Sequence, residues 1–203
     1  KAVRGYTDYA FVIDELNETS LKETGMQNCG TVTITDSSAA KTGTIKRDDN
    51  GTVGEKSYYV IRNWGTMTIE SGTVINNSGY RKTNPTGSMI DSSLICNGDC
   101  DGGSTLTIKG GTFTQNNFIA IKNGALGVLN VSGGTISSDH SAIQNWFKAD
   151  ITGGEIKGQL WTDAWEEGKS VGETKIGGDA KFTGEIVMDI TGSVAPTLAI
   201  NGG

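Results

Sequence analysis

Two tryptophans and three acids are grouped near the C-terminal end of the chain: Trp161, Asp163, Trp165, Glu166 and Glu167. An exposed indole ring stacks on the face of a sugar, and a neighbouring carboxylate accepts hydrogen bonds from sugar hydroxyls. The cluster therefore predicts a carbohydrate-binding site. The alternative interpretation is that the indole rings pack over a corner of the fold.

A second group of oxygen-bearing side chains lies in the segment 97–104. Asn97, Asp99 and Asp101 alternate along the chain and are followed by glycine, which resembles part of a calcium loop. A complete loop has more oxygen ligands and a distal bidentate glutamate, and none follows at that spacing. Ca²⁺ is therefore the one cofactor that the sequence suggests, and an ordinary polar loop is the alternative.

Two of the three cysteines belong to the same region: Cys96 directly precedes this segment and Cys100 lies within it. A disulfide between Cys96 and Cys100 would close a small local loop and leave Cys29 unpaired. Three inert thiols are the alternative, which a reducing compartment would favour.

Carboxylates are not arranged for glycoside hydrolysis, which needs two of them at a fixed separation across the bond. The pair Asp48 and Asp49 lies in an insertion, and Asp150 and Glu155 fall on one repeat, where we expect them to keep the surface soluble. The sequence therefore predicts no catalytic residue and a protein that is not an enzyme.

The structural elements that position these groups are marked by a recurring six-residue phrase. It reads Ile/Val, any residue, a small residue, Gly, Thr/Glu, then Val/Phe/Ile, and it occurs at 69–74, 108–113, 131–136 and 151–156. Looser copies lie at 176–182 and 200–203, and the copy at 34–45 carries an insertion. Such self-similarity is typical of stacked-coil proteins, in which each repeat buries its apolar face against its neighbours.

Alternation of side chains along a strand predicts which residues face the core. The anchor residues of successive phrases should form one inward row: Ile34, Ile69, Ile108, Val131, Ile151, Ile176 and Ile200. The residue two positions before an anchor should also point inward, as should Val74 beyond the turn; these partners are Val32, Met67, Leu106, Leu129, Ala149 and Leu198.

A second element, an apolar residue, any residue and then Asn, precedes the phrase. Its copies end at Asn28, Asn63, Asn97, Asn123 and Asn145, and the tripeptide 161–163 reads as a degenerate copy. Asn tolerates the left-handed conformation that a tight corner demands. Stacked amides also hydrogen-bond from coil to coil, so we expect an internal asparagine ladder. A polar binding row is the alternative, and Trp64 and Trp146, each directly after a ladder Asn, would lie along one edge.

These patterns predict an all-β fold: a right-handed, single-stranded parallel β-helix of about seven coils, each coil with three short strands and glycine at its corners. Residues 1–25 lack the repeat and are expected to form an N-terminal cap or an incomplete first coil. Residues 26–203 are expected to form the parallel β-helix, and its C-terminal end is expected to be truncated in mid-repeat. Insertions at 46–57 and 77–93 leave the corner after the third strand, and those at 98–104 and 164–173 leave the corner after the Asn.

Composition excludes several classes of protein. A net charge of −6 without a basic stripe argues against nucleic acid as a partner. The apolar runs are too short for membrane insertion. The 30 glycines disfavour regular helices, and with 2 prolines and no three-residue period they exclude collagen.

The segment 30–45 and the phrases that follow it resemble the Gly/Thr-rich repeat regions of large secreted and cell-surface proteins of bacteria. Those regions are similar to the pectate-lyase-like right-handed β-helix superfamily, and the resemblance covers about residues 26–203. It implies the fold but not an activity, because the same coil carries lyases, hydrolases, phage tail spikes, adhesins and inert stalks.

The resemblance also implies motifs that this chain lacks. Galacturonan hydrolases carry NTD, DD, GHG and RIK motifs on successive coils, whereas the one histidine here, His140, lies in SDHS. Lyases of this fold resemble a Ca²⁺-plus-Arg machine. Arg62 and Lys122 stand at equivalent places without a carboxylate cluster, so we interpret them as an exposed basic row.

The sequence therefore favours a non-catalytic structural or adhesive segment of an extracellular, cell-surface or virion-fibre protein. Its partners would be glycans, host or cell-surface proteins, or other copies joined end to end or laterally. A polysaccharide-binding or polysaccharide-degrading domain of tail-spike type is one alternative. Ice binding is another, because outward Thr-x-Thr pairs recur until Val128/Asn130 and Lys148/Asp150 replace them; the pairs are Thr31/Thr33, Thr66/Thr68 and Thr105/Thr107.

Overall fold

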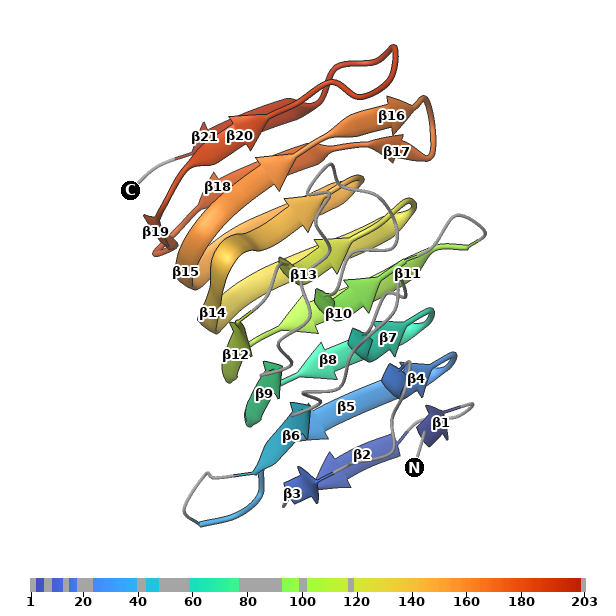
Figure 1. The fold of residues 1–203 in the computed structure, drawn as a ribbon, viewed down its shortest axis with the longest axis vertical. Coiled ribbons are helices and arrows are strands. Elements are labelled where there is room, and N and C mark those ends of the chain that lie inside the picture. Colours follow the sequence, from blue (N-terminus) through green and yellow to red (C-terminus); the bar gives the residue numbers. More distant parts are fainter. Residues whose placement is uncertain are drawn as a thin grey trace.

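The chain is a parallel β-solenoid (Figure 1). Its computed structural model describes residues 3–5, 9–12, 15–17, 24–39, 43–47, 59–76, 93–98, 102–116 and 119–201. These residues form strands, turns and bends, with no helix among them. The predicted all-β fold of stacked parallel strands is confirmed.

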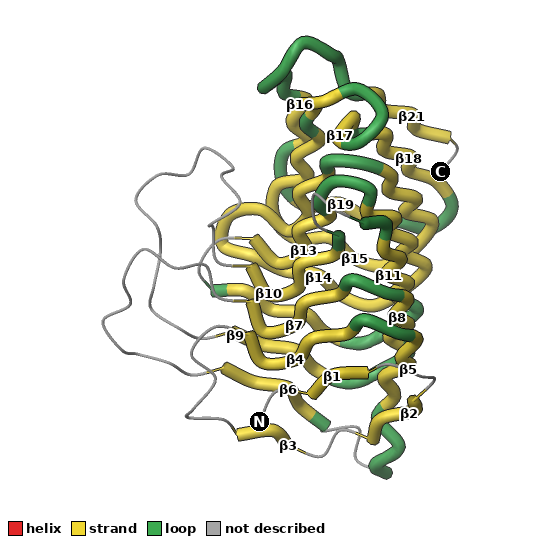
Figure 2. The backbone as a smooth tube through the Cα atoms, turned by 90° about the vertical axis from the view of Figure 1, so that its right-hand side faces the viewer, coloured by secondary structure: helices red, strands yellow, loops and turns green. Residues whose placement is uncertain are grey.

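The strands stack into three columns, seen from the side in Figure 2. The first column contains β1 (Val3–Gly5), β4 (Thr24–Asn28), β7 (Tyr59–Asn63), β10 (Ser93–Asn97), β13 (Ile119–Asn123), the ends of β14 (Gly127–Asn145) and β15 (Lys148–Thr162), and β20 (Ile186–Met188). The second contains β2 (Tyr9–Val12), β5 (Thr31–Thr35), β8 (Thr66–Ile69), β11 (Ser104–Ile108), the starts of β14 and β15, β18 (Glu173–Gly177) and β21 (Thr197–Asn201). The third contains β3 (Glu15–Asn17), β6 (Thr44–Arg47), β9 (Thr73–Asn76), β12 (Thr112–Gln115), the middle parts of β14 and β15, and β19 (Lys181–Thr183).

The register within the second column follows the repeat. The predicted anchor residues, from Ile34 to Ile200, pair one above the other in a single row. Their predicted inward partners also form one row, and both rows are at most 6% exposed from Val32 and Ile34 as far as Ile176. Val74, in the third column, is 1% exposed. The two-residue alternation therefore predicts the core correctly.

The glycine at the fourth position of each complete phrase makes the corner between the second and third columns. Gly72, Gly111, Gly134 and Gly154 have φ of 105°, 98°, 86° and 88°, values that side chains with a Cβ rarely adopt. A Cβ on Gly134 would also lie 2.8 Å from the carbonyl oxygen of Gly111 in the coil below. The corner therefore depends on glycine for both its conformation and its close stacking.

Some elements differ from three short strands per coil. In β14 and β15 the chain remains in strand pairing around two corners, with register shifts at the bends. Before residue 25, β1, β2 and β3 pair in parallel with β4, β5 and β6 and continue the columns. The expected insertion at 164–173 is a small antiparallel hairpin of β16 (Ala164–Glu166) and β17 (Ser170–Val171) that leaves the corner after the first column. The other predicted insertions lie largely outside the described residues.

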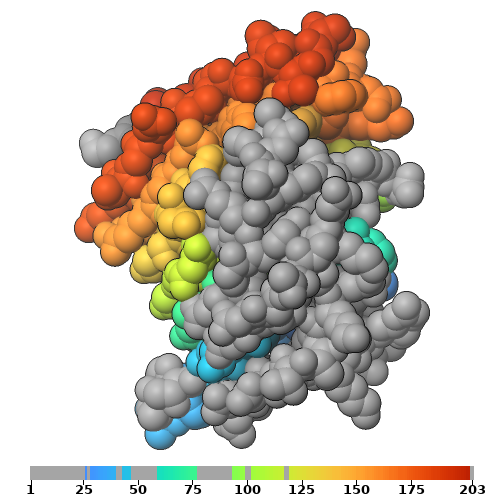
Figure 3. Space-filling view, viewed as in Figure 1, coloured from blue at the N-terminus to red at the C-terminus, as the bar shows by residue number. Residues whose placement is uncertain are grey.

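The C-terminal coil exposes inward-type residues. Ile200 pairs with Ile176 in the anchor row but is 63% exposed, and Ile186 and Met188 of β20 are each 40% exposed. Figure 3 shows the red C-terminal segment as the upper surface of the molecule. Ile200 thus occupies its predicted row without the predicted burial, because no described strand stacks on its far side.

Candidate functional site

The asparagine ladder is a buried polar network that runs through successive coils. Each Asn Nδ2 donates to the Oδ1 of the next Asn, at 2.8 Å from Asn28 to Asn63, 2.7 Å from Asn63 to Asn97, 2.7 Å from Asn97 to Asn123 and 2.8 Å from Asn123 to Asn145. All of these residues are 0% exposed. The predicted ladder is confirmed, and its amides are enclosed within the fold.

The ladder amides also close the corner between the first and second columns. Asn63 Oδ1 accepts from the amide of Gly65 at 3.3 Å, and its Nδ2 donates to the carbonyl oxygens of Gly65 and Thr105. The expectation that these asparagines adopt a left-handed conformation is wrong. Among described residues other than glycine, only Leu126 has a positive φ, of 57°. The Asn side chain shapes the corner by hydrogen bonding to the backbone, so the Asn backbone can stay in an ordinary conformation.

Two threonines terminate the ladder. Asn145 Nδ2 donates to Thr174 Oγ1 at 2.9 Å, and Thr174 shares a 2.7 Å hydrogen bond with Thr162 Oγ1. The register places Thr162, not Asp163, opposite Asn145. The interpretation of 161–163 as a degenerate copy is therefore wrong by one residue, because Leu160 takes the inward place beside Ile143 and Trp161 points outward beside Gln144.

The predicted carbohydrate cluster is divided by the fold. Asp163 is 1% exposed, and its carboxylate accepts hydrogen bonds from the amide of Ala164 at 2.7 Å and from Thr191 Oγ1 at 2.7 and 2.9 Å. Ala164 and Thr191 lie in successive coils, so the Asp163 carboxylate connects these coils by hydrogen bonds. Trp161 is half-buried on its strand, and its buried Nε1 has no hydrogen-bond partner among the described residues.

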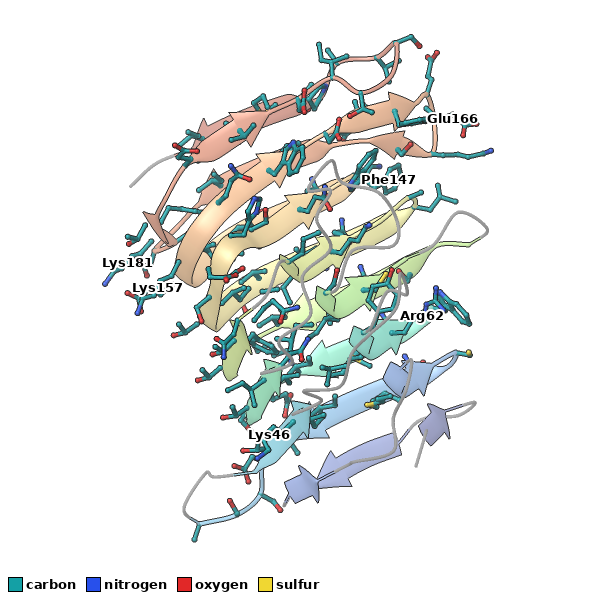
Figure 4. The ribbon with its side chains drawn as sticks, viewed as in Figure 1. Lys46, Arg62, Phe147, Lys157, Glu166 and Lys181 are labelled. Atoms are coloured by element: carbon teal, nitrogen blue, oxygen red, sulfur yellow. The ribbon has the colours of Figure 1, made fainter. Side chains whose placement is uncertain are left out.

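The remaining three members stay together on the hairpin of β16 and β17. Trp165 is 56% exposed, and Glu166 and Glu167 are exposed beside it. Glu166 Oε1 lies 3.0 Å from Lys169 Nζ. Figure 4 shows Glu166 on the hairpin, at the opposite edge of the stack from Lys157 and Lys181.

Trp64 and Trp146 follow ladder asparagines at matching places. The Trp64 amide donates to the carbonyl oxygen of Asn28, and the Trp146 amide donates to that of Asn123, both at 2.8 Å. Trp64 is 36% exposed and its ring lies 4.5 Å from the Arg62 guanidinium carbon, whereas Trp146 is half-buried. Neither indole lies in the coil that carries the hairpin.

The predicted calcium site falls partly outside the described residues. Asn97 Oδ1 accepts from Asn63 Nδ2 and, at 2.9 Å, from Ser104 Oγ, so this oxygen belongs to the ladder. Asp99 and Asp101 lie outside the described residues, and Ca²⁺ binding stays a prediction. Cys100 also lies outside them, so its disulfide with Cys96 stays a prediction; Cys96 is buried and its thiol donates to the carbonyl oxygen of Gly98 at 3.6 Å. Cys29 is an exposed free thiol.

The expected exposed basic row is only partly correct. Arg62, Cys96 and Lys122 are in register on the outward side of the first column, but Lys122 is 4% exposed. The next residue of the row, Gln144, is 0% exposed, and both polar atoms of its side chain lack hydrogen-bond partners among the described residues. This side of the column is covered, a property that strand alternation does not reveal.

His140 contacts the neighbouring Ser141. Its Nδ1 lies 2.7 Å from Ser141 Oγ, which donates to Gln159 Oε1 at 3.2 Å. Because Ser141 is 0% exposed, we assign this hydroxyl a structural role rather than that of a nucleophile.

The outer face of the second column is an ordered polar surface. Its two outward rows place the threonine pairs of β5, β8 and β11 in register, followed by Val128/Asn130, Lys148/Asp150, Glu173/Lys175 and Thr197/Ala199. A shallow depression of about 180 Å³ lies between the charged pairs and Val128/Asn130. Sequence reasoning identified the threonine pairs but missed the alternation of charge.

In the described part of the chain, no three His, Cys, Asp or Glu side chains come together as a metal-binding group. No helix there is long and apolar enough to cross a membrane.

Comparisons with protein-family models, with curated proteins and with solved structures find nothing that matches this chain.

Proposed function

We propose that this chain is a non-catalytic structural segment, which serves spacing, adhesion or assembly in an extracellular protein of a bacterial surface or a fibre. The observation that supports this role best is the use of the buried amides. From Asn28 to Asn145 they are engaged in joining coils. The Gly/Thr-rich repeats, which resemble those of bacterial surface proteins of the pectate-lyase-like superfamily, support the same proposal.

An activity screen tests the proposal. The purified chain is incubated with acidic and neutral polysaccharides, and new reducing ends and unsaturated products are measured. We expect no turnover above that of the heat-denatured chain. Turnover that Glu166→Gln or Glu167→Gln abolishes would overturn the proposal.

Glycan binding by the hairpin is the second candidate. It is favoured by the exposed indole of Trp165 beside the carboxylates of Glu166 and Glu167, since exposed aromatic rings stack on sugars. On a glycan array, Trp165→Ala should remove any specific signal. Trp64→Ala, which alters an exposed indole at a distant coil, is the matched control and should leave the signal unchanged. A signal that survives Trp165→Ala would exclude the hairpin as its source.

Ice binding is a third candidate, favoured by the register of the threonine pairs over β5, β8 and β11. Thermal hysteresis tests it directly. The replacement Thr68→Lys should then reduce the thermal hysteresis more than Thr66→Val, because valine preserves the shape of the threonine side chain and lysine does not. Absence of hysteresis in the unmodified chain would exclude this candidate.

A further inference from the structure

The outward positions of the second column carry charges in a pattern that complements itself. In β15 the two positions are Lys148 and Asp150, and in the neighbouring β18 they are Glu173 and Lys175. Each lysine therefore has an acid two residues away along its strand and another directly across in the next coil. All four side chains are exposed.

None of these four charged side chains forms an ion pair with another described residue. In the described part of the molecule, the ion pairs within 4.0 Å are those of Lys109 with Glu70, Lys157 with Glu155 and Lys169 with Glu166. Lys148 Nζ instead lies 5.2 Å from the Phe147 ring. The four charges thus remain available to an external partner.

The rest of the same face is uncharged. The three threonine pairs, Val128/Asn130 and Thr197/Ala199 bring no charge to the two outward rows. In Figure 2 the strands β5, β8, β11 and β18 lie along the right-hand side of the stack. An in-register sheet can lie against another sheet of the same kind face to face.

We propose that this face binds a second copy of the chain, in a lateral dimer whose two-fold axis runs along the solenoid. Such an axis places the first outward position of a coil opposite the second outward position of the same coil in the other copy. Lys148 then faces Asp150 of the other copy and Glu173 faces its Lys175, each twice, so that no like charges meet. Threonine pairs face threonine pairs in the coils below.

The size of the face predicts a weak dimer. Seven rows spaced about 4.8 Å apart give a height of roughly 30 Å. With a width of about 13 Å each copy would bury on the order of 400 Å², below the area of stable complexes, so the dimer should form only at high concentration. Exposed charge pairs are screened by salt, so the dimer should weaken as ionic strength rises.

This inference rests on the assembly role proposed above. Polysaccharide cleavage would refute that role and leave the dimer intact, so a failure of the proposed function can be distinguished from a failure of the dimer.

Charge variants test the proposal by sedimentation equilibrium at chain concentrations up to about 500 µM, where weak interfaces are populated. The acidic variant is Lys148→Glu with Lys175→Glu, and the basic variant is Asp150→Lys with Glu173→Lys. Each should be monomeric alone, because like charges then meet. Their mixture should form a dimer at least as readily as the unmodified chain. Both variants keep a negative net charge, −10 and −2 against −6, so bulk attraction does not explain pairing.

A charge inversion on another face is the matched control. Glu155→Lys with Lys181→Glu inverts an in-register pair of the third column and should leave association unchanged. Circular dichroism melting curves verify that every variant is folded. A strictly monomeric unmodified chain at about 500 µM in low salt, or acidic and basic variants that each dimerise alone, would overturn the proposal.

Discussion

The coils turn two corners by different means. At the corner between the first and second columns, an Asn side chain bonds to the backbone of its own coil and to the Asn of the next coil. At the corner between the second and third columns the turning residue is a glycine without a side chain, and after Gly134 the amide of Thr135 donates directly to the carbonyl oxygen of Gly111 at 2.9 Å. At the first corner a side-chain amide supplies the hydrogen bonds, and at the second the absence of a Cβ lets the backbones of adjacent coils approach closely.

The difference shows that a repeat can satisfy the hydrogen-bonding groups of its corner backbone in two ways. Replacement of an Asn leaves partners unsatisfied in both adjacent coils, because each amide bonds above and below. Replacement of a Gly introduces atoms into occupied space and disfavours the required φ. The two corners should therefore fail by different mechanisms and to different extents.

The largest effect is expected from Asn123→Leu. The substitution removes hydrogen bonds with Asn97, Asn145, Gly127 and Lys148, and it leaves buried polar atoms without partners. We expect the free energy of unfolding, from urea titration followed by circular dichroism, to fall by about 4 kcal/mol. Asn130→Leu, on the outer face, is the control and should change it by less than about 0.5 kcal/mol. A ladder variant as stable as this control would show that the amides do not hold the corner.

The next effect is expected from Gly134→Ala. The added Cβ would lie 2.8 Å from the Gly111 carbonyl oxygen at a φ of 86°. We expect a loss of about 3 kcal/mol in the same titration. Gly102→Ala, where a Cβ meets no atom within 4 Å, should be neutral or slightly stabilising. Equal stabilities of the two alanine variants would refute the steric account of the glycine corner.

A smaller effect is expected where the ladder ends. Thr162→Val removes the buried 2.7 Å hydrogen bond with Thr174 while it keeps the shape of the side chain. The expected loss is about 1 kcal/mol, and Thr162→Ser, which keeps the hydroxyl, should lose less than Thr162→Val. The reverse order would mean that the methyl group, not the hydroxyl, matters at this end.

The smallest effect is expected just outside the glycine corner. Glu70 and Lys109 form a 3.3 Å ion pair between adjacent coils, with side chains 45% and 55% exposed. A double-mutant cycle with Glu70→Gln and Lys109→Gln should give a coupling of at most about 0.5 kcal/mol, because water and salt screen the pair. A coupling several times larger would indicate that surface charge contributes to coil stacking as the corners do.

The fold was predictable because apolar residues, asparagine and glycine recur at fixed spacings along the chain. Alternation identified Met67 and Ile69 as inward, and the recurrent Asn predicted the ladder. The conformation at the Asn was not predictable, since the residue type permits a left-handed backbone without requiring it. The register at Thr162 was missed because an acid, Asp163, stands one place after it and imitates the missing Asn.

The candidate site was less predictable than the fold. Trp161 and Asp163 are close in sequence, but one lies on a strand and the other follows the corner, so the fold separates them. Strand alternation places Lys122 on the outward side of the first column, so its exposure of only 4% could not be predicted from that pattern. The charge pattern of Lys148, Asp150, Glu173 and Lys175 emerges only when the register of adjacent coils is known.

The ladder also has a direction. From Asn28 to Asn123 each amide donates to the next asparagine toward the C-terminal end, and from Asn63 to Asn145 each accepts from the asparagine before it. The carboxamide dipoles are therefore aligned head to tail, and each polarises the next. Rotating one amide by half a turn would set two oxygens against each other on one side and two NH₂ groups on the other. The five orientations are consequently coupled, and the stack has an intrinsic polarity that a chain of symmetric apolar contacts would lack.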